Sequence, residues 1–175
     1  ISSERLSDKA DILPVTVSER LIDKELLQVG KKVDITGQLR SYNNYNSKKN
    51  RLVLTVFARE IRLMEMDEEK TENQIFLNGF ICKAPIYRMT PLGREIADVL
   101  LAVNRAYGKS DYIPCICWGR NARFASTFEV GTHVQIWGRI QSREYVKKLN
   151  EEDLEKHTAY EVSISKLEYV SELEE

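Results

Sequence analysis

Two aromatic side chains, Tyr112 and Trp118, are the first candidates for contact with a ligand. They lie at the two ends of a segment, Tyr112–Trp118, whose composition and flanking residues predict a β-strand. Side chains an even number of positions apart on a strand point to the same side, so both rings are expected on one surface, with Cys117 directed away from it. Two exposed rings on one strand face can hold a ligand.

Residue types that carry catalysis or bind metals are poorly represented. His133 and His157 are the only two histidines, and neither belongs to a cysteine or carboxylate pattern with metal-ligand spacing. No glycine-rich phosphate loop and no nucleophile elbow occurs in the sequence. The sequence therefore predicts a protein that is not an enzyme, with no catalytic residue, no metal ion and no cofactor.

The segments that would position these rings occur twice in the chain. Residues 11–20 read DILPVTVSER, and residues 111–120 read DYIPCICWGR. After one inserted residue the match continues, with VGKKVDITGQL at 29–39 against VGTHVQIWGRI at 130–140. Repetition of this kind indicates two copies of one small β domain.

The two copies differ at the positions of the candidate rings. Ile12 of the first copy stands where the second has Tyr112, and Ser18 stands where the second has Trp118. Only the second copy therefore presents two aromatic rings on this strand. We expect it to hold a ligand that the first copy cannot hold.

Charge is segregated along the chain, although the total net charge is only -1. Residues 1–73 are neutral overall, residues 74–148 carry a net charge of +6, and residues 149–175 carry -7. A run of like charge is usually a solvated surface. Here, however, the basic segment coincides with the copy that carries the candidate rings.

Composition describes an ordinary globular protein. Hydrophobic residues make up 42% of the 175 residues, and no apolar run approaches the roughly 20 residues of a membrane span. Of three cysteines, Cys115 and Cys117 lie two positions apart on one predicted strand, where a disulfide fits poorly. We therefore expect a cytoplasmic location and no membrane partner. Because the chain begins at Ile1 rather than Met, we expect a fragment of a longer product.

The second copy contains five predicted strands and one short helix. Strand patterns cover residues 75–81, 94–103, 112–118, 134–142 and 160–170, and a helical pattern falls within 119–129. Five strands with a helix between the third and fourth give the element order of the OB-fold, a small and partly open barrel. A loop insertion is expected at 145–158.

The first copy repeats only the later part of this order. Residues 18–28 take the place of the helix, and residues 33–42 and 52–61 take the place of the last two strands. We predict an all-β fold of two tandem OB-fold barrels, each with a short helix between strands 3 and 4, the first incomplete at its N-terminus. The predicted parts are a degenerate OB-fold half, a polar linker, a complete OB-fold and an acidic end, at residues 1–63, 64–73, 74–170 and 171–175.

Three segments of the second copy resemble successive motifs of bacterial single-stranded-DNA-binding proteins. They are PIYRMTPLG at 85–93, IPCICWGR at 113–120 and VQIWGRIQSREY at 134–145. The resemblance covers residues 74–170 well and reaches residues 1–63 mainly through the internal repeat. It implies an OB-fold wrapped by single-stranded DNA, no catalysis, and an assembly of four OB-folds, which for two domains per chain means a homodimer.

The resemblance also implies roles for individual residues. The residues expected to stack on bases are Tyr107, Tyr112, Trp118 and Tyr145. The residues expected to contact phosphates are Arg88, Arg105, Lys109, Arg120, Arg143 and Lys147. Gln135 and Trp137 are expected at a subunit interface. Stacking suits a sequence-independent binder, because every base has a π-face.

These expectations lead to binding and protection of single-stranded DNA in replication, recombination or repair, in the cytoplasm with the nucleoid. The alternative is an OB-fold module for protein interaction or primosome assembly, with secondary binding of nucleic acid. The choice between DNA and RNA stays open, because neither stacking nor phosphate contacts detect the 2′-hydroxyl. The first half is expected to contact DNA weakly at most, through Tyr42, Tyr45, Lys48, Lys49 and Arg51.

Overall fold

The computed structural model describes all residues except 6, 8, 46–50, 70–72 and 173–175. The chain forms two units: the first consists of Ile1 and Leu13–Asn73, and the second of Ser2–Ile12 and Gln74–Glu175. Part of the predicted linker, the last residues of the predicted acidic end, and the candidate contacts Lys48 and Lys49 lie outside the described residues.

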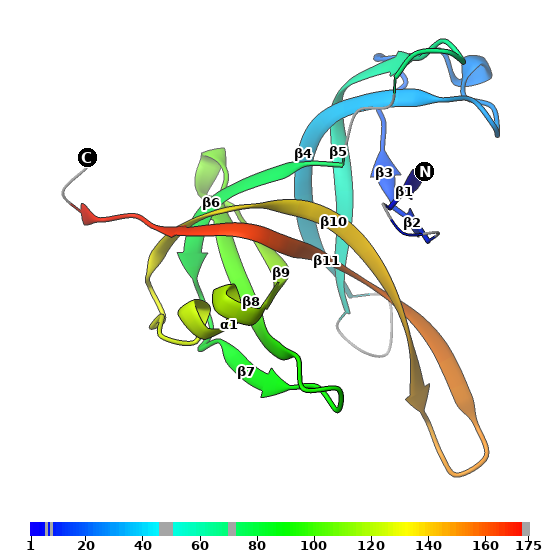
Figure 1. Cartoon of the computed structure of the whole chain (residues 1–175). Coiled ribbons are helices and arrows are strands. Elements are labelled where there is room, and N and C mark those ends of the chain that lie inside the picture. Colours follow the sequence, from blue (N-terminus) through cyan, green and yellow to red (C-terminus); the bar gives the residue numbers. More distant parts are fainter. Residues whose placement is uncertain (6, 8, 46–50, 70–72, 173–175) are drawn as a thin grey trace. The chain divides into compact units, whose positions relative to one another are not determined.

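The second unit is built on one curved sheet (Figure 1). Its strands are β6 (Ile75–Ile81), β7 (Ile86–Met89), β8 (Glu95–Asn104), β9 (Ser110–Trp118), β10 (His133–Lys148) and β11 (Leu154–Tyr169). They follow the order β6-β10-β11-β9-β8-β7, and an additional pairing of β6 with β8 closes the sheet on itself. The helix α1 (Gly119–Ala125) connects β9 to β10. An all-β fold with one barrel-like sheet of the OB type is thus confirmed.

Alternation in the sequence decides which side chains enter the barrel. In β6, Leu77, Gly79 and Ile81 are buried and the residues between them are not. The largest side chains exposed by less than 2% come from five strands and are Ile81, Leu101, Ile113, Val134, Ile136 and Val162. Burial raises the pKa of the Cys117 thiol to about 12 and also raises that of Cys115. Both thiols are therefore packing residues rather than nucleophiles.

Strands β10 and β11 continue past the barrel as a two-stranded arm, defined here as residues 143–159 (Figure 1). Paired residues run from Arg143 with Ala159 to Lys148 with Leu154. The expected loop at 145–158 is therefore wrong, since only residues 149–153 connect the strands. The arm has no apolar side to bury: residues 143–148 are all exposed. Alternation of apolar and polar residues arises only where one side of a strand is buried. The sequence of the arm therefore does not show the alternation that predicts a strand.

The N-terminal segment forms a short hairpin of β1 (Ser2–Glu4) and β2 (Ala10–Ile12). Its turn is held by a hydrogen bond from the Arg5 amide to the Lys9 carbonyl, at 3.0 Å. The turn between β8 and β9, which contains η2 (Ala106–Gly108), is held by the equivalent bond from Arg105 to Lys109, at 2.7 Å. These residues lie 100 positions apart, so the internal repeat includes this hairpin.

The first unit contains a three-stranded sheet in the order β3-β5-β4. The strands are β3 (Val15–Thr16), β4 (Val33–Asn44) and β5 (Arg51–Leu63), which confirms the strands predicted at 33–42 and 52–61. The register of β4 against β5 shifts at Gly37, and that of β10 against β11 shifts at the repeated position, Gly138. A Cβ atom at either glycine would collide with the opposite carbonyl oxygen, of Phe57 or of Ser163. The repeat thus preserves a bulge as well as strands.

The helix expected at 18–28 is wrong, since the first unit has only the 3₁₀ turn η1 (Lys24–Leu26) there. Asp23 begins this turn by accepting a hydrogen bond from the Glu25 amide. In the second unit α1 packs mainly on β8, and Leu21 and Leu26 of the first unit stay 39% and 50% exposed. A short helix gains most of its stability from such packing. The second barrel, predicted for residues 1–63 as incomplete at its N-terminus, stays a prediction.

No helix in the described part of the chain is long and apolar enough to cross a membrane.

Candidate nucleic-acid interface

The solvent side of β9 carries the two candidate rings. Asp111, Ile113, Cys115 and Cys117 are buried on one side of the strand, and Ile116, which has the parity of the two rings, is buried as well. Tyr112 lies on the other side and is 44% exposed, and Trp118 is half-buried on that side. Both rings have the strand parity opposite to Cys117, as the spacing predicts, and a common exposed surface stays a prediction. The cause is the two-residue period of the strand.

A cation lies over the second ring. The guanidinium carbon of Arg94, at the start of β8, is 4.5 Å from the centre of the Trp118 ring. The register of β8 against β9 pairs Ile96 with Trp118 and so brings Arg94 to this position. Arg94 was missed by the sequence reasoning, because 24 residues separate it from Trp118 and only the strand register joins them.

Tyr107 projects from the turn between β8 and β9. Its side chain is fully exposed and its backbone φ is +65°, the only positive value for a non-glycine residue among those described. Such a backbone is strained for a residue with a Cβ and persists where the surrounding structure imposes it. Here an ion pair closes the hairpin, with Arg105 Nε 2.7 Å from the buried Asp111 carboxylate. The hairpin therefore holds an aromatic ring out in solvent.

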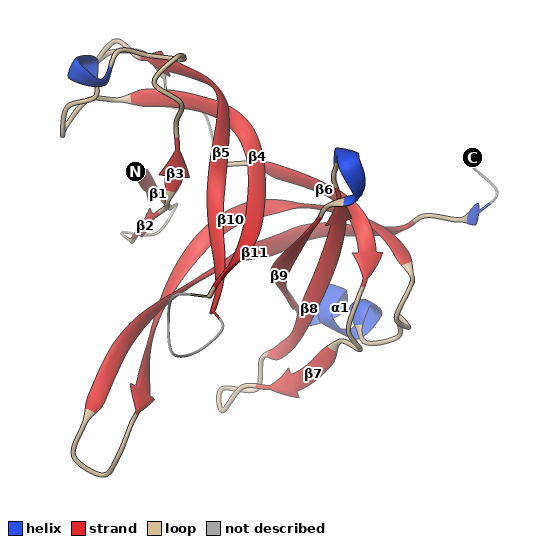
Figure 2. Cartoon of the chain, turned by 180° about the vertical axis from the view of Figure 1, so that it is seen from behind, coloured by secondary structure: helices blue, strands red, loops and turns tan. Residues whose placement is uncertain are grey.

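Tyr145 lies on the arm, away from the other three rings in sequence and structure. Its ring is 39% exposed and stacks on His157 of the paired strand, with 5.5 Å between ring centres. His157 in turn lies 2.9 Å from a carboxylate oxygen of Glu155. Figure 2 shows that η2 and the tip of the arm lie at opposite ends of the second unit. The candidate rings are thus spread along one unit rather than gathered in a pocket.

The six candidate phosphate contacts fall into two groups. Arg88, Arg105 and Arg143 form ion pairs with Asp98, Asp111 and Glu161, with separations of 3.0, 2.7 and 3.3 Å. Lys109, Arg120 and Lys147 are exposed, and no ion pair joins them to another residue in the described part of the chain. The second group keeps its full charge available. The first group is held in place by carboxylates.

Gln135 and Trp137 lie on a separate surface formed by β6, β10 and β11. The Trp137 ring is 5.0 Å from that of Phe76, which is 50% exposed, and the Lys166 ammonium lies 4.5 Å above it. Strand register places Gln135 opposite Asn78. These residues form a partly exposed aromatic patch on the outer side of the sheet. The patch is distinct from the β9 face.

A network of charged groups, absent from the sequence reasoning, lies at the start of the arm. Asp11 of β2 is completely buried, and both Arg5 and Arg139 donate hydrogen bonds to its carboxylate. Burial would raise the pKa of Asp11, but the hydrogen bonds from Arg5 and the Ser142 amide hold it below its ordinary value. The only available signal was the repeated Arg-Asp spacing of six residues, Arg5 to Asp11 and Arg105 to Asp111.

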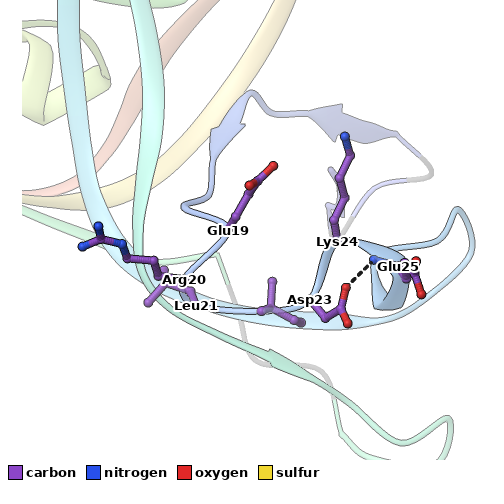
Figure 3. Close-up of a pocket in the computed structure, with 7 residues that line it drawn as sticks. Glu19, Arg20, Leu21, Asp23, Lys24 and Glu25 are labelled. Carbon is purple, nitrogen blue, oxygen red and sulfur yellow. Dashed lines mark hydrogen bonds between the residues drawn. The ribbon is translucent and has the colours of Figure 1, made fainter.

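A shallow hollow beside η1 offers no chemistry (Figure 3). One loop lines it, with residues Glu19, Arg20, Leu21, Ile22, Asp23, Lys24 and Glu25. The bond from the Glu25 amide to Asp23, at 3.0 Å, only stabilises the turn. Among the described residues, no group of three or more histidine, cysteine or acidic side chains is arranged to hold a metal ion.

Comparison with known proteins finds one protein family whose model matches residues 72–170 of this chain. These residues fit the model of the "Single-strand binding protein family". The chain is 36% identical over 80 residues to "Single-stranded DNA-binding protein B" of Bacillus subtilis (strain 168), a match that covers 42% of this chain and 71% of that protein. It is also 36% identical over 80 residues to "Single-stranded DNA-binding protein 2" of Listeria innocua serovar 6a, covering 50% of that protein. The chain spans about half the length of most curated relatives it matches.

The fold is shared with a solved structure of low sequence identity. The wild-type single-stranded DNA binding protein from Thermus aquaticus superposes with a TM-score of 0.69 and 22% identity, over 84% of this chain and 63% of that one. A deletion mutant of the same protein gives a TM-score of 0.71 over 85% of this chain and 64% of that one. At this level of identity the likeness concerns the fold alone.

Proposed function

The chain belongs to the single-strand binding protein family, and on this premise we propose that it binds and protects single-stranded DNA without catalysis. The relatives named above are single-stranded DNA-binding proteins, and this binding fits roles in DNA replication, recombination or repair. A cytoplasmic location with the nucleoid follows from such a role.

The observation that carries the proposal is the solvent face of β9. Tyr112 and Trp118 share this face, and Arg94 lies against the Trp118 ring. Stacking of a base on an aromatic ring contributes about 1 to 3 kcal/mol and requires no particular base. A nearby guanidinium can pair with the phosphate of a stacked nucleotide. Tyr107 and Tyr145 extend the same chemistry to the hairpin and to the arm.

The cations listed as phosphate contacts have unequal roles in this proposal. Lys109, Arg120 and Lys147 neutralise phosphates as mobile charges, because they are exposed and make no ion pair within the described residues. Arg88, Arg105 and Arg143 already lie beside carboxylates. Because the carboxylates offset their charge, these three arginines contribute less to the positive electrostatic potential that attracts phosphates.

The proposal is tested by fluorescence titration with oligo-dT, using the fact that Trp118 and Trp137 are the only two tryptophans. The variant Trp137→Phe leaves Trp118 as the sole tryptophan, and its emission is expected to be quenched at low salt as bases stack. The matched variant Trp118→Phe leaves Trp137, whose emission is expected to change little. Equal responses from the two variants, or no response from Trp118, would contradict stacking on the β9 face. The same titration with oligo-U measures the preference for DNA over RNA.

For the assembly we propose a homodimer that contains four OB-folds in total. The support is the aromatic patch around Trp137 and Gln135, which has the exposed Phe76 beside it. Aromatic residues are enriched at the centres of subunit interfaces. Two domains in each chain would then give four in the dimer. No membrane takes part.

The alternative function, a module for protein interaction or primosome assembly, is not favoured. Both the family match and the named relatives concern binding to single-stranded DNA. In that alternative the β9 rings would contact protein, and oligo-dT would leave Trp118 emission unchanged.

A further inference from the structure

The buried carboxylate of Asp11 belongs to an arrangement that we call the Arg5–Asp11 clasp. It consists of Arg5 and Asp11 from the N-terminal hairpin together with Ser142 of β10. Arg5 donates to both oxygens of Asp11, from Nη2 at 2.6 Å and from Nε at 2.9 Å. Asp11 is fully buried and Arg5 is 25% exposed. Burial of a carboxylate is costly unless it is paired and hydrogen-bonded, so these contacts hold the hairpin firmly.

The clasp occupies the free edge of β10. Strand β6 pairs with β10 over His133–Gly138, and β10 continues ten residues further as the arm begins. At Ser142 the backbone amide donates to Asp11 Oδ1 at 2.9 Å, and Arg5 Nη2 donates to the backbone carbonyl at 3.0 Å. Two side chains therefore satisfy the peptide groups that a neighbouring strand would satisfy. An open strand edge is stabilised in this way at one defined point.

Three further bonds fix the same point. The Ile12 amide donates to the Ser142 hydroxyl at 3.2 Å, and that hydroxyl lies 3.3 Å from Asp11 Oδ1. Arg139, three residues before Ser142 on β10, also donates to Asp11. The hairpin thus grips β10 where the strand leaves the barrel.

Tyr145 follows Ser142 by three residues, about 10 Å along an extended strand. We propose that Asp11 is a positioning residue for nucleic-acid binding: by holding Ser142, it fixes the direction in which the arm presents Tyr145 to the bases. The proposal rests on the proposed function and deepens it. It assigns a role to the N-terminal hairpin, which lies outside residues 72–170 that match the family.

Electrostatics alone would have the opposite effect, which makes the proposal testable. Asp11 is a negative charge in the unit that carries the proposed contacts, so its removal would strengthen attraction to phosphates. A clasp that positions the arm predicts the reverse. Asp11→Ala is expected to weaken binding of the full chain to oligo-dT about fivefold, the lower end of the loss for one stacked base. The exposed Glu129→Gln, which removes one charge from the same unit, is the matched control and is expected to bind as tightly as the unmodified chain or slightly more tightly.

A double-mutant cycle identifies the route of the effect. The losses of oligo-dT affinity from Asp11→Ala and from Tyr145→Ala are expected to overlap. The double variant should then bind oligo-dT no more weakly than whichever single variant has the lower affinity. The losses from Asp11→Ala and Trp118→Ala are expected to multiply, because Trp118 lies on β9. Hydrogen exchange of the Ser142 amide should accelerate in Asp11→Ala while exchange in the barrel core is unchanged.

Two outcomes would overturn the clasp as a positioning device. One is an Asp11→Ala variant that is folded by circular dichroism and binds oligo-dT as tightly as the unmodified chain. The other is multiplicative losses for Asp11→Ala and Tyr145→Ala. If Asp11→Ala does not fold, Arg5→Ala replaces it, because it removes the bond from Arg5 to the Ser142 carbonyl, and the same cycle with Tyr145→Ala applies. If Trp118→Ala also has no effect on binding, the proposed function fails, whereas an effect of Trp118→Ala alone removes only the clasp.

Discussion

The guanidinium carbon of Arg94 lies 4.5 Å from the centre of the Trp118 ring. Arg94 directly precedes β8 and Trp118 ends β9, so the pair lies where these two neighbouring strands meet, at one edge of the candidate surface. The guanidinium covers one face of this ring, so a base must stack on the other face or displace Arg94 from the ring. The pair therefore combines the two interactions on which sequence-independent binding of a single strand depends.

Truncation of the ring tests this combination. Trp118→Ala is expected to weaken binding to oligo-dT by about 1 to 3 kcal/mol, and Tyr112→Ala by a similar amount. Arg94→Ala should cost less, about 0.5 to 1 kcal/mol, since it removes a cation–π contact and one charge. Ser18→Ala, at the position of the first copy that corresponds to Trp118, should leave affinity unchanged. Urea unfolding separates loss of folding from loss of binding, and a Trp118→Ala variant that merely unfolds would identify Trp118 as a core residue.

Salt dependence measures the phosphate contacts. The logarithm of the association constant should fall linearly with that of salt concentration, by about 0.7 per neutralised phosphate and by a total of about 2 to 4. Lys147→Gln should reduce this slope by about 0.7, because Lys147 is exposed and forms no ion pair within the described residues. Lys31→Gln, in the first unit, should leave it unchanged. A flat salt response of the unmodified chain is incompatible with the proposed function.

The aromatic patch predicts the oligomeric state. Trp137→Glu removes the ring that packs on Phe76, and loss of a central aromatic anchor from an interface commonly costs about 2 kcal/mol or more. Light scattering should report a dimer for the unmodified chain and a shift toward monomer for the variant. The exposed Leu92→Glu, on a turn of the same unit, is the control and should remain dimeric. An unmodified chain that is monomeric at tens of micromolar would contradict the homodimer.

Acidification should weaken the Arg5–Asp11 clasp. Hydrogen bonds from Arg5 and Ser142 overcome the effect of burial and lower the pKa of Asp11 below 3.8. A carboxyl group with a lowered folded-state pKa contributes stability that is present above the unfolded-state pKa and is lost as the pH falls through the folded-state pKa. The stability advantage of the unmodified chain over Asp11→Asn should therefore be full at pH 6 and shrink below about pH 4. Urea unfolding at both values measures it, and a difference independent of pH would assign the effect to packing.

The core of the second unit could be predicted from the sequence because its strands have one buried side. Alternation placed the strand at 75–81 with the bounds that the structure has, and spacing of six placed Tyr112 and Trp118 together. The helix within 119–129 was found for the same reason, since Ala122 and Ala125 are buried against the sheet. Local pattern and tertiary packing agree in these segments.

The same reasoning failed where the pattern lacked a packing partner. Residues 143–148 are exposed on both sides of the arm, so nothing in their order distinguishes a strand from a loop. Residues 18–28 take the place of the helix in the repeat, but Leu21 and Leu26 remain exposed and only η1 forms. Whether a short segment forms a helix depends mainly on its packing against the rest of the protein, and the sequence of the segment alone does not show that packing.

The sequence by itself determined the duplication, the strand periods and the segregation of rings and positive charge into the second copy, because these are properties of order along the chain. Only the tertiary structure decided which distant residues meet. Arg94 reaches Trp118 through strand register, and Asp11 reaches Ser142 across 131 positions. Such contacts depend on how strands pair and where an edge is left open, and that pairing is set by the burial of the whole sheet rather than by local order.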